Sequence, residues 1–203
     1  MNIEAAVLNV ALFLILLTPH EYAHARVAAL LGDETPRREG RLTLNPLAHV
    51  DWLGTVILPA VTSLLGGGFL GWGKPVSTDL SQLRGGLNGL ALVAVAGPLS
   101  NVVFAVLLAG VAVLSAGRFP MAAQLAAQGV LLSLYLALFN LLPVPPLDGS
   151  KLLLAARIPV AVYEELARFG FILLIVAMVA SPLGRWLSRL SEEGTLLLLR
   201  LFG

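Results

Sequence analysis

The sequence contains no cysteine and few charged residues. The absence of cysteine excludes disulfide bonds and thiolate metal sites. Charged residues make up 12% of the 203 residues, about half the share of roughly 25% in soluble domains, and the mean hydropathy is +0.88. The net charge is +1 and no basic stripe is present, which argues against a nucleic-acid-binding surface. This composition indicates an integral membrane protein.

Long apolar segments recur along the whole chain. They lie at about 4–31, 53–70, 87–114, 121–142 and 160–180, with a short helix predicted at 149–157 and an amphipathic surface helix at 185–203. No Lys or Arg precedes the first segment and no small-residue cleavage site follows it, so we interpret it as a retained helix rather than a signal peptide. We expect one all-α integral membrane domain over residues 1–203 without a separate soluble domain. Its predicted fold class is a polytopic helical bundle of roughly five to six membrane segments with short interfacial strands or loops.

The most polar stretch is the loop at 33–51, which contains three arginines. By the positive-inside rule, these arginines favour the cytoplasmic side for this loop. Short strands are predicted at 40–45 ("GRLTLN") and 74–78 ("KPVST"). The three tryptophans of the chain lie next to the ends of apolar segments, which is typical of interfacial anchors.

The first apolar segment contains the polar pattern "HEYAH" at 20–24. On a helix, positions i and i+4 lie on one face, so His20 and His24 can bind one metal ion. Zinc suits imidazole ligands, and Glu21 can take a proton from a water activated by the metal. The alternative is a pair of core histidines joined by an interhelical hydrogen bond. Polar residues in a membrane helix are costly unless they have a function, which favours the metal site.

A catalytic zinc site has three protein ligands, so a third ligand lies elsewhere in the chain. Asp148, between an apolar segment and a short helix, is one candidate, although it could instead cap that helix. His49 in "LNPLAHVD" is the rival. Its alternatives are a hydrogen bond within the loop or a position close to the metal ligands or the substrate.

Three motifs in order resemble the site-2 protease family of intramembrane zinc metalloproteases. They are "HEYAH", "AGPLSN" at 96–101 and "NLLPVPPLDG" at 140–149. The resemblance implies zinc ligation by His20, His24 and Asp148, Glu21 as the general base, and Asn140 close to the substrate or the oxyanion. The stretches "LNPLAHVDWLGT" and "GWGKPV" further resemble a small bacterial and archaeal branch that lacks PDZ and CBS domains.

The expected function is therefore that of a zinc-dependent endopeptidase that cleaves a membrane-protein substrate in or near a transmembrane segment. The expected location is the prokaryotic cell (inner) membrane. The partners are the substrate and the lipid bilayer, with no nucleic acid, and the sequence does not indicate an oligomeric state. Asn101 either supports the scaffold or reaches the substrate. "KPVST" or "LPVPP" could hold an unwound substrate by strand addition. The alternatives are an inactive protease-like scaffold, a metal transporter, and a zinc hydrolase with a non-peptide substrate.

Overall fold

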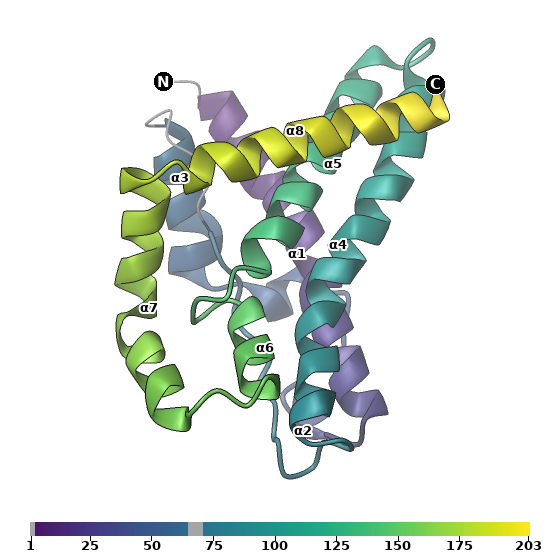
Figure 1. Ribbon diagram of the computed structural model, residues 1–203. Coiled ribbons are helices and arrows are strands. Elements are labelled where there is room, and N and C mark those ends of the chain that lie inside the picture. The colour runs from purple at the N-terminus through teal and green to yellow at the C-terminus, as the bar shows by residue number, and fades with distance from the viewer. Residues whose placement is uncertain (1–2, 65–70) are drawn as a thin grey trace.

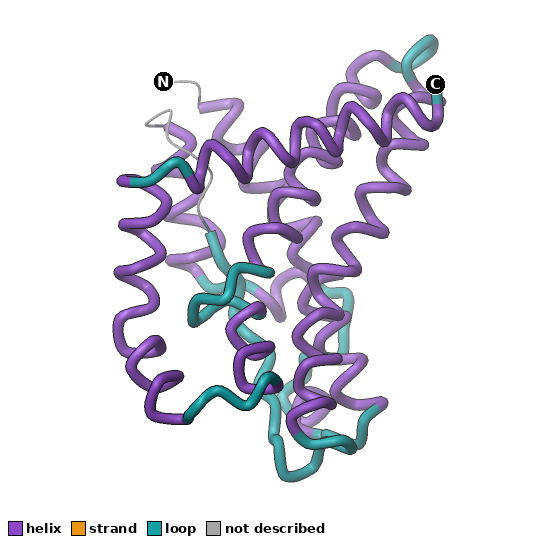
Figure 2. The backbone as a smooth tube through the Cα atoms, in the orientation of Figure 1, coloured by secondary structure: helices purple, strands orange, loops and turns teal. Residues whose placement is uncertain are grey.

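The computed structural model describes residues 3–64 and 71–203, and its regular elements there are all helical (Figures 1 and 2). The elements are α1 (Ile3–Leu30), α2 (Thr35–Arg38), η1 (Pro46–His49), η2 (Trp52–Ile57), α3 (Leu58–Leu64), α4 (Leu87–Ser115), α5 (Pro120–Asn140), α6 (Gly149–Ala155), α7 (Val160–Ala180) and α8 (Leu183–Phe202). The expected polytopic helical bundle is thus confirmed.

The short strands expected at 40–45 and 74–78 are absent from these described ranges. A strand needs a neighbouring strand for its ladder of hydrogen bonds. The backbone near residue 74 instead makes isolated bonds to loops and turns. The Trp72 N–H donates to the Gly54 carbonyl at 3.0 Å, and the Lys74 N–H donates to the His49 carbonyl at 2.9 Å. Residues 71–79 therefore form a segment without regular secondary structure that is held by these backbone hydrogen bonds.

Among the described residues, three helices are long and apolar enough to cross a membrane: Ala6–Leu30, Leu87–Ser115 and Pro120–Asn140. α7 and α8 pass the same test only as a pair bent by 70°, which gives at most four spans rather than the roughly five to six expected. The run at 53–70 forms a π-helical turn, capped by Asp51, and the short helix α3. The remainder of that run, 65–70, lies outside the described residues.

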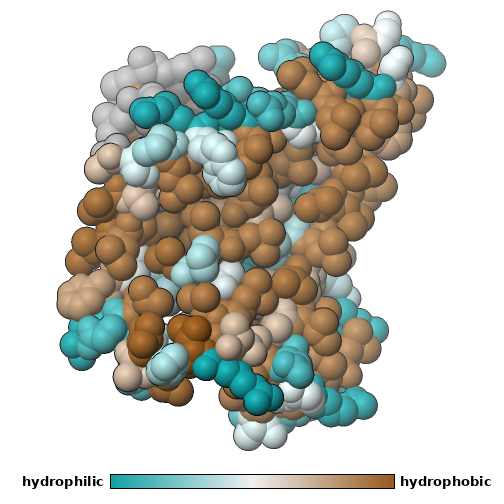
Figure 3. All heavy atoms as spheres, in the orientation of Figure 1, coloured by the Kyte–Doolittle hydropathy of each residue, from teal (hydrophilic) through white to brown (hydrophobic). Residues whose placement is uncertain are grey.

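The surface agrees with a membrane protein. A broad band of hydrophobic side chains covers the visible face between hydrophilic groups at its two ends (Figure 3). α8 lies across one end of the bundle (Figure 1), and it buries Leu187, Ser191 and Thr195, which are spaced four residues apart and so share one face.

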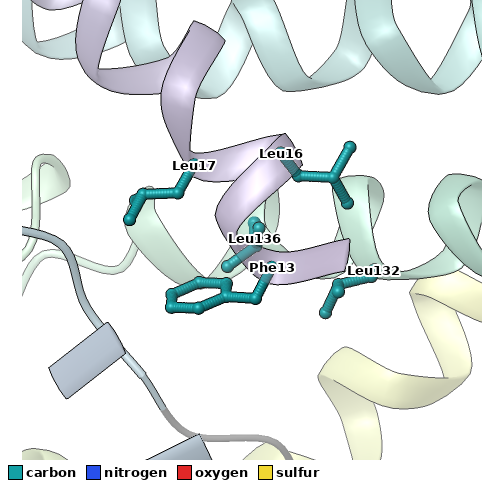
Figure 4. Packing of buried hydrophobic residues seen from close by; sticks show 5 residues of the cluster. All are labelled: Phe13, Leu16, Leu17, Leu132 and Leu136. Carbon is teal, nitrogen blue, oxygen red and sulfur yellow. The ribbon is translucent and has the colours of Figure 1, made fainter. Parts of the chain in front are cut away.

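The core joins α1, α4 and α5. Phe13, Leu16 and Leu17 of α1 pack with Leu132 and Leu136 of α5 (Figure 4). The small residues Ala105 and Ala109 of α4 pack with Val130 of α5. Small residues let membrane helices approach closely. This packing fixes the position of α1, which contains the candidate metal ligands, against α4.

Candidate metal centre

His20 and His24 lie one turn apart on α1 and face α4 from inside the bundle. They are 2% and 3% exposed, and their Nε2 atoms lie 3.1 Å apart. Room for the two imidazoles comes from Gly97 of α4. A Cβ atom at Gly97 would overlap the His24 ring and lie 2.7 Å from His20 Cε1. The glycine of the "AGPLSN" motif is therefore needed for close approach of the two helices at this point.

Asp148 reaches the two histidines from the turn between α5 and α6. Its Oδ2 atom lies 3.2 Å from His20 Nε2 and 3.0 Å from His24 Nε2. Asp148 occupies the N-cap position of α6, but its side chain makes no capping hydrogen bond. Gly149 follows because a Cβ there would lie 2.5 Å from the Leu142 carbonyl oxygen. The geometry thus turns Asp148 toward the histidines rather than toward the end of the helix.

The three side chains fit a zinc ion. Ligand atoms on a tetrahedral zinc, with bonds of about 2.0–2.1 Å, lie about 3.3 Å apart. The three separations observed here are 3.0–3.2 Å, and all three residues are buried. The His24 Nδ1–H donates to the Val93 carbonyl at 2.7 Å, which leaves the Nε2 lone pair for a metal. Asp148 Oδ1 accepts a hydrogen bond from Lys151 Nζ at 2.9 Å, so Oδ2 remains for the ion.

Glu21 lies beside these ligands and lines the same pocket. Its side chain is buried, and Oε2 has no hydrogen-bond partner among the described residues. It forms an ion pair with Arg41, whose Nη2 lies 3.9 Å from Oε2. The carboxylate is therefore available to a water molecule in the pocket.

The pocket has a volume of about 410 Å³ and its walls are mostly apolar. Phe13 and Leu136, from the core cluster of Figure 4, form part of one wall. Trp72 forms another, with its ring edge-to-face on Phe171 of α7 at a centroid distance of 5.4 Å. Trp72 thus contributes to the pocket rather than serving only as the interfacial anchor expected from the sequence.

The three remaining candidates lie in different places. Asn140, at the end of α5, lines the pocket and donates one Nδ2 hydrogen bond to the Leu136 carbonyl at 3.0 Å. Asn101 is fully buried on α4 and is not among the pocket-lining residues. His49 is also fully buried outside the pocket, and its Nε2–H donates to the Thr43 carbonyl at 2.9 Å. This bond corresponds to the alternative in which His49 makes a hydrogen bond within its own loop. Burial lowers the pKa of the His49 imidazole.

Sequence reasoning missed three residues of this region. The sequence indicates Arg41 only as a charge of the polar loop, and Trp72 only as an anchor within the family-like stretch "GWGKPV". No sequence pattern singles out Lys151. Each acts through a contact with a segment far away in the sequence or through a ligand whose position was unknown, so residue type and spacing carried no signal for it.

Comparisons with known proteins give a consistent result. No model of a protein family matches the chain, and no solved structure matches it. The chain is 37% identical over 180 residues to "Putative zinc metalloprotease YwhC" of Bacillus subtilis, covering 83% of this chain and 78% of that protein. It is 33% identical over 188 residues to "Putative zinc metalloprotease Rip2" of Mycolicibacterium smegmatis, covering 89% of this chain and 70% of that protein.

The helical membrane fold, the His20–His24–Asp148 group and these relatives define a membrane zinc metalloprotease. The chain belongs to the site-2 protease family.

Proposed function

We propose that this protein is an intramembrane endopeptidase that hydrolyses a peptide bond in or near a transmembrane segment of a membrane-protein substrate. The observation that carries the proposal is one pocket within the helical bundle that holds the three buried candidate zinc ligands, the Glu21 carboxylate and a mostly apolar wall. An apolar wall suits the side chains of a transmembrane segment.

In the proposed mechanism, His20, His24 and Asp148 would hold zinc, which would supply Lewis acidity toward a water molecule and the scissile carbonyl. Glu21 accepts a proton from the attacking water at its carboxylate and delivers it to the leaving amine nitrogen, so that water and the peptide yield a carboxylic acid and an amine. Asn140 has a second Nδ2 hydrogen, beyond the one bonded to Leu136. That hydrogen can stabilise the developing oxyanion.

The segment at 72–74 is the proposed site for unwound substrate. The backbone groups of Trp72 and Lys74 bond to residues that do not line the pocket. The Trp72 N–H donates to Gly54 and its C=O accepts from Thr55. The Lys74 N–H donates to His49 and its C=O accepts from Arg41. Successive residues of an extended chain point these groups to opposite sides. Gly73, between them, lines the pocket and has no backbone partner among the described residues. Its free N–H and C=O can pair with a substrate strand. Gly73 directly precedes "KPVST", one of the two stretches for which the sequence predicts strand addition.

The proposed location is the bacterial cell membrane, crossed several times, with the loop at 33–51 on the cytoplasmic side. The candidate spans support several membrane crossings. The arginines of that loop support its cytoplasmic side.

The test is cleavage by detergent-purified protein of a panel of transmembrane peptides, with Glu21→Gln beside it. The variant should keep its zinc and its fold while losing at least about 100-fold in turnover, the usual contribution of a general base. Glu193→Gln, an exposed carboxylate on α8, is the matched control and should cleave normally. Undiminished cleavage by Glu21→Gln would exclude Glu21 as the base. A zinc-loaded wild type that cleaves no peptide would favour the scaffold or a non-peptide substrate.

A further inference from the structure

Arg41 is a buried cation next to the candidate active site. It follows α2 in the polar loop and is 2% exposed. Burying an unpaired charge is very costly, so a buried arginine needs partners that compensate. Its Nη1 donates to the Ala48 carbonyl and its Nη2 to the Lys74 carbonyl. The same Nη2 atom lies 3.9 Å from Glu21 Oε2.

These contacts join three segments that are distant in the sequence. Ala48 belongs to η1 in the loop, Lys74 to the segment at 72–74 that borders the pocket (the pocket segment), and Glu21 to α1. The Lys74 N–H donates to the carbonyl of His49, the residue after Ala48, so the loop holds the pocket segment at two points. Arg41 itself does not line the pocket and so does not touch a substrate there.

Burial lowers the pKa of the Arg41 guanidinium, and the Glu21 carboxylate opposes that shift. The guanidinium nevertheless remains charged at neutral pH. Glu21 Oε2 is buried and has no hydrogen-bond partner among the described residues, and the guanidinium of Arg41 compensates its charge at 3.9 Å. An arginine whose only role was to close the loop would not need to stand beside this carboxylate.

We propose that Arg41 is a positioning residue that sets the Glu21 carboxylate and the substrate-binding segment at 72–74 relative to one another. The inference rests on the proposed function, because its kinetic consequence requires a peptide held at Gly73 and a base at Glu21. A base must come within about 2.6–3.2 Å of the proton that it accepts. A misplacement of about 1 Å can cost roughly 100-fold in rate.

The first experiment measures zinc content and cleavage kinetics for Arg41→Met, Arg41→Lys and the control Arg38→Met. Arg38 lies in the same loop but is exposed, and its guanidinium donates to the Thr35 hydroxyl at 3.1 Å. We expect native zinc content in all three variants. Arg41→Met should lower kcat and raise KM, with kcat/KM falling at least tenfold. Arg41→Lys should recover part of kcat because it keeps the charge, and Arg38→Met should match the wild type. Wild-type kcat/KM in Arg41→Met would overturn the proposal.

A second experiment reads the Arg41–Glu21 coupling without any substrate. Thermal midpoints in detergent are compared for Arg41→Met, Glu21→Gln and the double variant. Removing Arg41 leaves a buried carboxylate without its cation, so Arg41→Met should melt earlier, and adding Glu21→Gln should restore part of the loss. Strictly additive shifts would overturn the coupling. If the wild type cleaves no peptide, the proposed function fails while this cycle still decides whether Arg41 acts on Glu21.

Discussion

Replacing Gly97 by alanine should weaken zinc binding, although alanine is the better helix former. In the interior of a helix, Gly→Ala is normally worth about 0.5–1 kcal/mol of stabilisation. At Gly97 the added Cβ would overlap the His24 ring and lie 2.7 Å from His20 Cε1. Neither imidazole can then keep its position between α1 and α4.

The size of the effect follows from the packing. Forcing one extra methyl group into a packed core costs about 1–3 kcal/mol. If relaxation of the two ligands absorbs that strain, the same energy is lost from zinc binding, and the zinc dissociation constant rises by about 5- to 150-fold. The structure therefore predicts a loss of zinc affinity with little loss of helix stability.

The assay is competition for zinc with a chelator of known affinity, using detergent-purified protein. Gly110→Ala is the matched control on the same helix, because its added Cβ meets its nearest atom, Phe202 Cε1, at an ordinary 3.7 Å. The control should bind zinc normally. Equal zinc affinities for Gly97→Ala, Gly110→Ala and the wild type would refute the steric argument.

Two further predictions concern the pocket and the loop. Trp72→Ala should leave the zinc content unchanged and raise KM for a transmembrane peptide by roughly 30-fold, as expected for about 2 kcal/mol from a buried aromatic anchor; an unchanged KM would remove Trp72 from the substrate site. Burial lowers the pKa of His49 in the folded state. Its contribution to stability is therefore fully present above the unfolded-state pKa of about 6.5 and is lost as the pH falls below that value. The free energy of unfolding decreases by at most about 1.4 kcal/mol per pH unit. His49→Gln keeps a donor for the Thr43 carbonyl and should flatten the fall of the thermal midpoint between about pH 7 and pH 5; parallel curves for variant and wild type would contradict this.

Local pattern was enough to predict the first half of the site. The helical period alone places His20 and His24 on one face, and the 2% and 3% exposures agree with that. The sequence alone did not decide the role of Asp148, because a residue at this position could equally well cap the following helix. Its capping bond is missing and its Oδ2 lies within 3.2 Å of both histidines, which only the folded turn decides.

The rest of the site depends on tertiary contacts that sequence spacing does not encode. Arg41 and Lys74 are 33 positions apart, and their hydrogen bond requires the loop to fold back over the pocket segment. The span count also differs from the sequence prediction. Hydropathy predicts one apolar segment over 53–70, but the described part of that run forms a π-helical turn and α3, and the apolar helix Trp52–Thr62 is too short to cross a membrane.

The measurement that tests the central claim most directly is the zinc content of the detergent-purified protein beside His24→Ala and Asp148→Ala. The three-ligand geometry predicts about one zinc per chain in the wild type and a strong loss in both folded variants. Full zinc retention in Asp148→Ala would contradict the site described here, as would a folded wild type that takes up no zinc when zinc is added.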